Sequence, residues 1–408
     1  MLRNRYTALA MLAILALGGV ATVGTLLAGK SETGSPDTSA VNKNNSADPA
    51  VILMIGDGMG FEQLDAASLF AYGRKGKLTL QQLPVRGDVA THPAEGKKTV
   101  TDSAAAGTAI ATGVKVRNGV LSLRIPGNGE RLETLLEIAS DRGLRTGLVS
   151  TTHLTHATPA AFGAHVVRRD HYDDIAEDLL NRSRPDLLLG GGGKGLKPDD
   201  AESAGYAVAL TRRGLQRIAE RSKRPARVAG LFGEGHMPYE YEYAMRINSG
   251  YDRLPHLSEM TAFALEHLSA EESGFFLMVE SGRIDHAGHT NHVHNNVMET
   301  LEFDNAVRTV LKWAAGRENV LVVVTSDHET GGMKVTGKTA LGVWPEVSWA
   351  SKGHTGVNVP LYATGPGARA FVGSMDNTDI FRKLRDRMKL TSPAAKDAAA
   401  VGAGPDGY

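Results

Sequence analysis

Short runs of predominantly apolar residues constrain the fold of this chain more than any other feature. They lie at residues 51–55, 146–149, 187–189, 275–279 and 320–325. Such continuous runs are typical of strands that are buried on both faces, because a half-exposed strand alternates apolar and polar residues. Amphipathic helical patterns separate them, at residues 132–141, 172–181, 257–268 and 293–315. This alternation predicts a doubly wound α/β domain: a mostly parallel central sheet with helices on both faces.

The two ends of the chain and one internal segment depart from this pattern. Arg3 and Arg5 precede a long apolar stretch, which predicts a signal peptide or a signal anchor over residues 1–28. Residues 29–49 are rich in Ser, Thr, Asn and Asp and predict a flexible linker. The folded domain is therefore expected at residues 50–390, followed by a flexible tail at 391–408. Residues 194–255 are richer in charge, Pro and Gly and lack the alternation, which predicts an insertion near one edge of the sheet.

The leader also predicts the compartment. A cleaved signal peptide would send the folded domain to the periplasm or the extracellular space, and an uncleaved one would anchor it to the membrane.

The composition of the chain excludes nucleic acid as a specific partner and excludes cysteine chemistry. The chain has 45 basic and 45 acidic side chains, without the basic excess that a nucleic-acid-binding surface needs. It has no cysteine, so disulfides and thiolate metal ligands are excluded and a transition metal must rest on His, Asp and Glu.

Residues of metal-binding type follow four of the predicted strands. The four groups are Asp57; His153, His156 and Thr158; Glu280, Asp285 and His289; and Asp327 and His328. After a single strand, a charged residue is more often a solvated loop residue or a helix cap. In an open α/β sheet, however, ligands bind beyond the carboxyl ends of the strands. Four such groups together therefore predict a metal centre at that edge.

The spacing within these groups suits two neighbouring cations. Asp285 and His289 are four residues apart, so on a helix they can face the same metal, and another histidine would complete that site. Asp327 and His328 are adjacent, and both can reach a metal where the backbone turns at a strand end. The two oxygens of Asp57 can bridge a pair of metals. Metals about 3.5–4 Å apart clamp the attacking and leaving oxygens of a displacement at phosphorus.

Ser103 opens a stretch of small residues that predicts a helix. The N-terminus of a helix favours an anion. Serine or aspartate at such a position is usually only an N-cap, so the local sequence alone does not predict a nucleophile. The neighbouring metal-binding residues change this interpretation, because a metal that stabilises the alkoxide replaces the histidine base of a serine protease.

Six motifs together make the chain resemble the alkaline phosphatase family over residues 50–368. They are residues 55–60 (Ile-Gly-Asp-Gly-Met-Gly), 101–105 (Thr-Asp-Ser-Ala-Ala), 157–161 (Ala-Thr-Pro-Ala-Ala), Glu280 with Asp285 and His289, 325–328 (Thr-Ser-Asp-His) and 353–356 (Gly-His-Thr-Gly). Agreement of all six in order and spacing makes the resemblance highly specific.

The resemblance implies hydrolysis of small phosphate monoesters to an alcohol and inorganic phosphate through a phosphoserine on Ser103. Arg169 matches the arginine that grips phosphate, although an Arg168–Arg169 pair taken alone would be surface charge. The implied metal ligands are Asp285, His289 and His354 for one Zn²⁺, Asp57, Asp327 and His328 for a second Zn²⁺, and Asp57, Thr158 and Glu280 for Mg²⁺. Many relatives are homodimers, so the resemblance leaves a homodimer open.

Two positions follow a variant of the family pattern. His156 stands where the enterobacterial type has aspartate, and His286 where that type has lysine; animal members resemble this chain at both positions. Both histidines are expected beside the metal ligands, and an imidazole there could ligate zinc or hold a magnesium-bound water. The same scaffold also suits a phosphodiesterase or a sulfatase, and a phosphate-binding protein without turnover is a third alternative.

Overall fold

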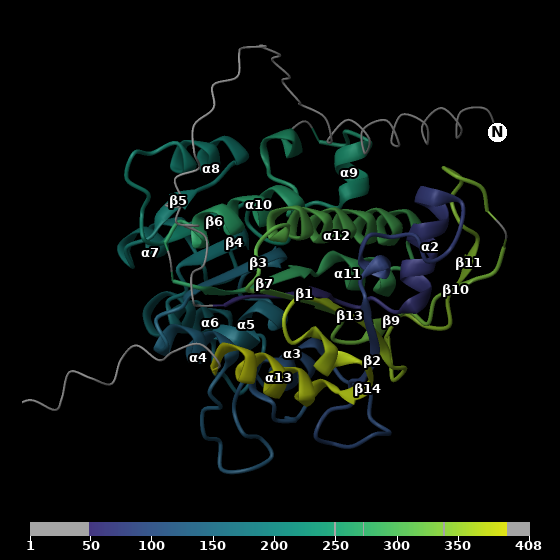
Figure 1. Cartoon of the computed structure of the whole chain (residues 1–408), viewed down its shortest axis with the longest axis horizontal. Coiled ribbons are helices and arrows are strands. Elements are labelled where there is room, and N and C mark those ends of the chain that lie inside the picture. Colours follow the sequence, from purple (N-terminus) through teal and green to yellow (C-terminus); the bar gives the residue numbers. More distant parts are fainter. Residues whose placement is uncertain (1–48, 249, 272, 338, 390–408) are drawn as a thin grey trace, which may run out of the picture.

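The computed structural model describes residues 49–389 except 249, 272 and 338 (Figure 1). The predicted leader at 1–28, nearly all of the predicted linker at 29–49 and the predicted tail at 391–408 lie outside the described residues. Within the described part of the chain, none of the helices combines the length and the apolar character needed to cross a bilayer.

A ten-stranded sheet forms the centre of the domain, in the order β14-β2-β13-β8-β1-β7-β3-β4-β6-β5. Its strands are β1 (Ala50–Gly56), β2 (Val85–Ala90), β3 (Arg145–His153), β4 (Leu187–Gly191), β5 (Ala207–Ala209), β6 (Val228–Leu231), β7 (Phe275–Ser281), β8 (Val320–Thr325), β13 (Val359–Thr364) and β14 (Gly373–Asp376). Strand β13 runs antiparallel to its neighbours β8 and β2, and the other pairs are parallel. The predicted mostly parallel sheet is confirmed.

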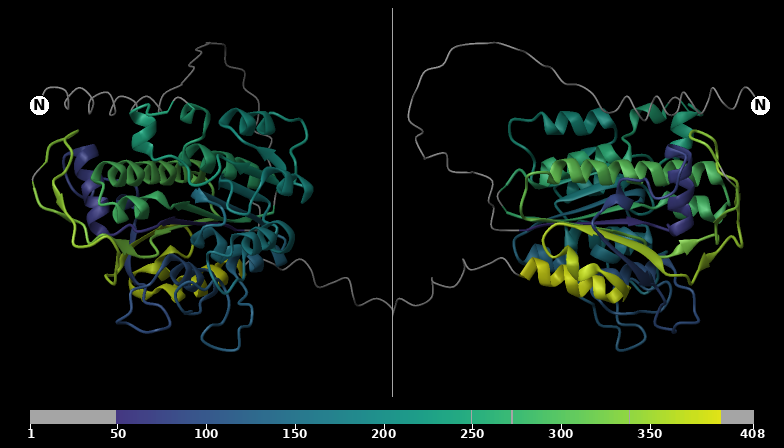
Figure 2. Two further views of the ribbon diagram at one scale, coloured as in Figure 1. Left: turned by 180° about the vertical axis from the view of Figure 1, so that it is seen from behind. Right: turned by 45° about the vertical axis from the view of Figure 1, so that its right-hand side comes forward.

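Helices cover both faces of this sheet, as two further views make clear (Figure 2). One layer contains α2 (Phe61–Tyr72), α8 (Arg212–Ala219), α9 (Glu240–Ala244), α10 (Leu257–Leu268), α11 (Arg283–His289) and α12 (Val293–Ala314). The other contains α3 (Ser103–Thr112), α4 (Leu135–Asp141), α5 (Ala157–Gly163), α6 (Tyr172–Glu177) with its π-helical continuation η2 (Asp178–Ser183), and α13 (Asn377–Lys389). Helix α7 (Pro198–Ser203) follows β4 in the chain. The doubly wound architecture is therefore confirmed.

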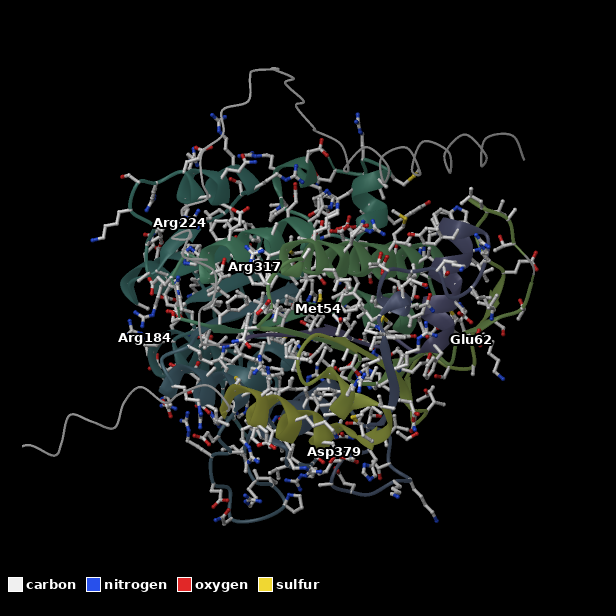
Figure 3. All side chains as sticks on the ribbon, viewed as in Figure 1. Met54, Glu62, Arg184, Arg224, Arg317 and Asp379 are labelled. Atoms are coloured by element: carbon white, nitrogen blue, oxygen red, sulfur yellow. The ribbon has the colours of Figure 1, made fainter. Side chains whose placement is uncertain are left out.

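Strand β1 shows why the apolar runs are continuous. Val51, Leu53 and Ile55 pack into the core under one helical layer, whereas Ile52 and Met54 pack into the core under the other. Both sets of side chains are fully buried, so neither face of the strand can be polar. Met54 accordingly lies at the centre of the molecule, while charged side chains such as Arg184 and Arg224 lie at its periphery (Figure 3).

The segment 194–255 does alternate strands and helices, contrary to the sequence-based expectation. Strands β5 and β6 lengthen the sheet beyond β4 in parallel register, and α7 and α8 accompany them. These strands have only three and four residues. Strands that short show no recognisable hydrophobic pattern, so the composition of the segment suggested an insertion without strands and helices.

Two small antiparallel pairs complete the structure. One joins β10 (Lys334–Val335) to β11 (Val347–Ser348), and the other joins β9 (Glu329–Thr330) to β12 (His354–Thr355). In the second pair His354 lies opposite Thr330. This pairing brings His354, which is distant in sequence, next to the end of β8.

The central position of β1 gives a test of the fold. Leu53→Ala should lower the free energy of unfolding by about 2–5 kcal/mol, because it leaves a cavity in a core that is closed on all sides. Leu210→Ala is the control: Leu210 is 50% exposed, and its truncation should change stability by less than about 0.5 kcal/mol. Urea unfolding at matched metal concentration measures both. Equal destabilisation by the two variants would contradict the packing described here.

Candidate active site

The residues that the sequence singled out come together at the carboxyl ends of four neighbouring strands. Asp57 directly follows β1, Glu280 is the next-to-last residue of β7, and Asp327 lies two residues after β8. His153 ends β3, which lies beside β7 in the sheet. Parallel strands bring their carboxyl ends to the same edge, so one topology collects groups from distant parts of the chain.

Asp285, His289 and His354 form the first group that can hold a metal. The Nε2 atom of His289 lies 3.3 Å from Asp285 Oδ2, and the Nε2 atom of His354 lies 3.4 Å from Asp285 Oδ1. The two Nε2 atoms are 3.1 Å apart. One carboxylate and two imidazoles at this spacing form a ligand set that zinc accepts.

The backbone fixes which nitrogen of each imidazole faces this group. His354 Nδ1 lies 2.8 Å from the carbonyl oxygen of Thr101, and His289 Nδ1 lies 2.5 Å from that of Lys352. A carbonyl oxygen only accepts, so each Nδ1 carries a proton and donates it. Each Nε2 is thereby left available to a cation, as is usual for histidine ligands of metals.

Asp57, Asp327 and His328 form the second group, and all three side chains are fully buried. His328 Nε2 lies 3.2 Å from Asp327 Oδ2 and 3.5 Å from Asp57 Oδ1. Among the described residues, neither oxygen of Asp57 has a hydrogen-bond partner, and neither does Asp327 Oδ2. Buried carboxylate oxygens without donors are costly, so this group fits a bound cation.

In the absence of a cation, the pKa values of the two carboxyl groups are raised, which also fits a cation site. Burial, followed by the neighbouring Asp327, raises the pKa of Asp57 well above its usual value. Burial and then Asp285 raise the pKa of Asp327 to about 6. A cation between these carboxylates would reverse both shifts, because a nearby positive charge favours the ionised form.

Gly58 allows the first and second groups to lie side by side. Its backbone is in the left-handed region, with φ at 75°. A Cβ atom at this position would lie 2.6 Å from the Cα atom of Asp285. Glycine is therefore required both for the turn after β1 and for the close approach of α11.

A third group lies on the other side of Asp57. Donor atoms of Asp57, His156 and Glu280 lie within 4.8 Å of one another. Among the described residues, His156 Nδ1, Thr158 Oγ1 and Glu280 Oε1 are buried without a hydrogen-bond partner. The other oxygen of Glu280 accepts hydrogen bonds from Ser150 and Thr152. His156 is thus positioned as a candidate ligand itself, rather than only beside the ligands.

Ser103 lies at the N-terminus of the buried helix α3, as the sequence predicted. Its hydroxyl oxygen is 3.2 Å from His328 Nε2, so it adjoins the second group. Asp102 caps the helix by accepting a hydrogen bond from the Ala105 N–H. The serine is therefore held on a rigid element at the edge of the candidate metal centre.

Arg169 reaches the same place from the segment after α5. One of its terminal nitrogens is 3.1 Å from Asp102 Oδ2 and the other is 3.2 Å from His156 Nε2. Arg168, by contrast, pairs with Asp170 and its side chain is 67% exposed, against 29% for Arg169. The structure thus separates the two adjacent arginines, and Arg169 is the one that contacts Asp102, the residue before Ser103.

Comparisons with known proteins identify the family. A family model described as alkaline phosphatase matches residues 49–348. The chain is 34% identical to the alkaline phosphatase of Escherichia coli (strain K12), over 86% of this chain and 89% of that protein. The chain belongs to the alkaline phosphatase family. As a member it is an enzyme, a hydrolase of phosphate monoesters, and both the fold and the function predicted from the motifs are confirmed.

Solved structures of alkaline phosphatases have the same fold. The crystal structure of a cold-active enzyme from Shewanella sp. matches with a TM-score of 0.72 at 29% identity, over 83% of this chain and 99% of that chain. A variant of the alkaline phosphatase from the Antarctic bacterium TAB5, with a histidine replaced by aspartate, matches with a TM-score of 0.70 at 30% identity, over 84% and 98%. That variant holds magnesium in a site called M3.

Several residues of this alkaline phosphatase site escaped the sequence analysis. Thr330 donates a hydrogen bond to Asp285 Oδ1 at 2.5 Å, and its hydroxyl lies 3.2 Å from His328 Nδ1. It therefore links the first and second groups. Its position two residues after His328 in extended chain was the available signal, because such residues share a face.

Asp102 and His236 were not assigned a role either, and His153, which the sequence placed among residues of metal-binding type, belongs to none of the three groups. Asp102 was visible in its motif only as a cap, yet it also holds Arg169. His236 lies near both His153 and His286, with ring centroids 4.6 and 4.4 Å apart. Among the described residues, no carboxylate forms a hydrogen bond or an ion pair with the His286 side chain. Its Nδ1 lies 2.9 Å from an Arg283 nitrogen. These histidines are far apart in the sequence and come together only in the folded structure, so their spacing could not predict the contacts.

Burial and then Arg169 lower the pKa of His156 well below its usual value. Its imidazole is therefore neutral at neutral pH and keeps a lone pair for a metal or a hydrogen bond. A neutral imidazole next to Arg169 also avoids repulsion between two cations.

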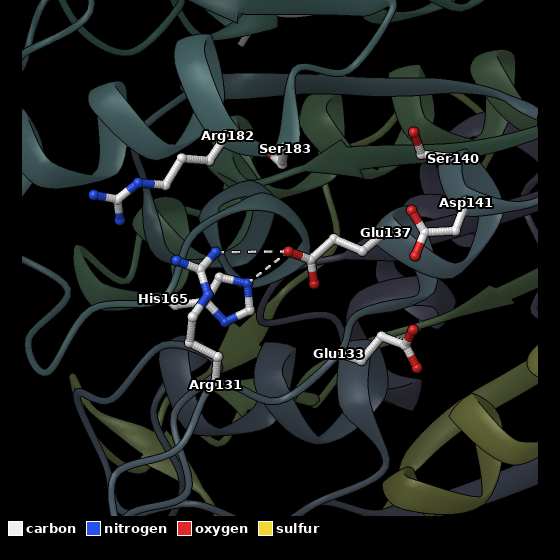
Figure 4. Close-up of a pocket in the computed structure, with 8 residues that line it drawn as sticks. All are labelled: Arg131, Glu133, Glu137, Ser140, Asp141, His165, Arg182 and Ser183. Carbon is white, nitrogen blue, oxygen red and sulfur yellow. Dashed lines mark hydrogen bonds and ion pairs between the residues drawn. The ribbon is translucent and has the colours of Figure 1, made fainter.

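A hollow elsewhere on the surface is separate from this alkaline phosphatase site (Figure 4). It is lined by Arg131, Glu133, Glu137, Ser140, Asp141, His165, Arg182 and Ser183, none of which belongs to the three groups. Within it Glu137 pairs with His165 at 2.9 Å and with Arg131 at 3.8 Å. Arg182 pairs with Asp178, which lies outside the lining.

The hydroxyl of Thr330 gives a test of the metal-binding geometry. Thr330→Val keeps the shape but removes the donor to Asp285, so metal affinity should fall about 10- to 100-fold. Thr336→Val, at an exposed position, is the matched control. Competition against a graded series of chelators measures retained zinc. Unchanged affinity in the Thr330 variant would show that this hydrogen bond does not orient Asp285.

Proposed function

We propose that the enzyme cleaves phosphate monoesters through a phosphoserine on Ser103, at a centre that binds two zinc ions and one magnesium ion. One observation carries the proposal. Three carboxylate oxygens, the two of Asp57 and Oδ2 of Asp327, are buried without a hydrogen-bond partner among the described residues, and the Ser103 hydroxyl adjoins their group. Carboxylates in that state require cations, and cations beside a serine hydroxyl supply the activation that this nucleophile needs.

The donor atoms support the assignment of ions. One zinc would be bound by Asp285, His289 and His354 and the other by Asp57, Asp327 and His328, since imidazole and carboxylate suit zinc. Magnesium would be bound by Asp57, Thr158 and Glu280, which offer oxygen only. The imidazole of His156 beside that third group leaves zinc as its alternative occupant. When bound, these cations stabilise the negative charge on the serine oxygen, the leaving oxygen and the phosphoryl group.

The chain's own residues then carry the two displacements. The oxygen of Ser103 forms a bond to phosphorus while the ester P–O bond breaks, and the alcohol leaves. Water next forms a bond to phosphorus while the seryl P–O bond breaks, which releases phosphate and restores the serine. Each displacement inverts phosphorus, so the sum retains its configuration. The N-terminus of α3 favours phosphate oxygens through its free N–H groups.

Arg169 would hold the non-transferred oxygens of the phosphoryl group. Its planar guanidinium donates parallel hydrogen bonds to two oxygens, which a lysine cannot reproduce. Asp102 supports this role by fixing one side of the guanidinium from the position next to Ser103. A phosphate diester has one fewer charged oxygen for this fork, which favours monoesters over diesters.

We also expect the enzyme to act outside the cytoplasm, because the leader predicted at residues 1–28 has the pattern of an export signal. A homodimer is the assembly expected from the resemblance. Neither expectation enters the chemistry above.

Replacing the nucleophile tests the central step. Ser103→Ala should lower kcat for an aryl phosphate monoester at least about a thousand-fold and abolish the acid-trapped phosphoenzyme. Ser140→Ala, an exposed serine on α4, should leave both unchanged. Phosphoserine formation is followed by rapid acid quenching and mass spectrometry. Undiminished turnover in the Ser103 variant would overturn the nucleophile assignment, and faster cleavage of the matching diester would indicate a phosphodiesterase.

The neighbouring arginines provide an internally controlled second test. Arg169→Lys should lower kcat/KM for the monoester by about 10- to 100-fold, because it loses a charge-assisted hydrogen bond to phosphate. Arg168→Lys changes a side chain that faces solvent and pairs with Asp170, so it should have little effect. Steady-state kinetics and inhibition by inorganic phosphate measure both. Equal effects at the two positions would mean that Arg169 does not bind phosphate.

A further inference from the structure

A second cluster of metal-ligand residues lies away from the active site. Glu240, His256 and Glu302 each offer a donor atom, and the three donors lie within 4.8 Å of one another. They come from three helices: Glu240 begins α9, His256 is the N-cap of α10, and Glu302 lies within α12. These helices share one layer above the sheet (Figure 1).

Hydrogen bonds orient all three of these side chains. His256 Nδ1 lies 2.8 Å from Glu240 Oε2. Glu302 accepts from the Ser258 N–H at 2.8 Å and from the Asn305 amide at 3.0 Å. Each carboxylate oxygen has more than one lone pair, so these bonds orient Glu302 and leave it capacity to bind a cation.

Buried carboxyl groups gather around this cluster. Glu299 is one turn before Glu302 on α12, and it accepts a hydrogen bond from the Glu240 N–H at 2.7 Å. Glu299 is 1% exposed and Glu302 is 8% exposed. Burial and then Glu240 raise the pKa of Glu299 to about 8 and that of Glu302 to about 7. A cation beside these carboxyl groups would oppose both shifts, because a nearby positive charge favours the ionised form.

His256 supplies part of that charge by holding a proton. Although its burial disfavours the charged form, Glu240 raises the pKa of His256 to about 9. A divalent ion would replace this proton and bring a larger charge to the same carboxylates. Metals and protons compete for imidazole and carboxylate ligands in this way.

Tyr243 provides an independent observation. It is buried and its ring lies 4.7 Å from that of His256, measured between centroids. Its hydroxyl is buried without a hydrogen-bond partner among the described residues. Burial and then Glu240 and Glu299 raise the pKa of this hydroxyl, which therefore lies in the field of the same carboxylates. A buried, unpaired hydroxyl beside this cluster indicates that a polar occupant belongs there.

We propose that Glu240, His256 and Glu302 bind a divalent metal ion of the zinc class. An imidazole nitrogen with two carboxylates suits zinc, whereas calcium and magnesium prefer oxygen ligands alone. Ligands bound to zinc at about 2.0–2.2 Å lie about 3.3–3.6 Å apart, which small side-chain adjustments reach from the observed spacing. The proposal does not depend on the proposed catalytic mechanism.

The position of the cluster assigns the ion a structural role. It would join the start of α9 to the start of α10 and to the middle of α12. Helix α9 has only five residues and depends on such contacts, because a helix of that length is not stable by itself. The ion would hold the segment around α9 on the helical layer.

Zinc counting with matched variants tests this site. Wild type, Glu302→Gln and Glu266→Gln are equilibrated with excess zinc, desalted and analysed by mass spectrometry for metal. Glu302→Gln preserves shape but weakens a ligand, so it should hold about one zinc fewer per chain than wild type. Glu266 is exposed on the same helix as His256, so its variant should match wild type. Phosphatase activity of Glu302→Gln should remain near wild type, which shows that the lost ion is not catalytic.

Crystals of wild type soaked in zinc locate the ion directly. Anomalous scattering at the zinc edge should give a peak between Glu240, His256 and Glu302. The absence of that peak, or equal zinc content in wild type and Glu302→Gln, would overturn the proposal. The crystal experiment uses the wild type alone, so it decides the question even if the variant folds poorly.

Discussion

The active site depends on one electrostatic constraint: carboxylates are buried at the edge of the sheet, and most of their oxygens have no donor among the described residues. Asp57 and Asp327 are fully buried, and three of their oxygens have no hydrogen-bond partner among the described residues. Such oxygens destabilise a protein unless cations join them. The chain therefore carries an unfavourable electrostatic arrangement at this edge that a metal would relieve, and Ser103, the proposed nucleophile, adjoins it.

The parallel sheet makes this concentration of charge possible. Strands β8, β1, β7 and β3 are neighbours, and each delivers its own polar groups to the same edge. Two close approaches then bring the groups together. Gly58 lets α11 come within contact of the turn after β1, and the short pairing of β9 with β12 brings His354 opposite Thr330. Rigid elements thus hold the donor atoms before any ion binds, which reduces reorganisation on binding.

The same rule, that buried polar groups need partners, distinguishes candidate binding sites from other clusters of charged residues in the chain. In the hollow around Glu137, the Glu137 carboxylate is paired with His165 and Arg131. The cluster around Glu302 differs, because Glu299 and Glu302 are buried beside Glu240 and, among the described residues, the neighbouring Tyr243 hydroxyl has no hydrogen-bond partner. Whether buried charged and polar groups are paired is therefore a better guide to a binding site than the mere presence of charged residues or of a surface hollow.

The sequence by itself determined the fold class and most of the candidate site, because continuous apolar runs and motif spacing are local properties of the chain. Short edge strands such as β5 and β6 gave no period, so their place in the sheet was missed. Only the tertiary structure decided that Asp102 supports Arg169, that Thr330 joins two groups and that His236 meets His286. Those contacts join segments, or satisfy buried atoms, in ways that depend on packing in three dimensions, and no spacing along the chain encodes that packing.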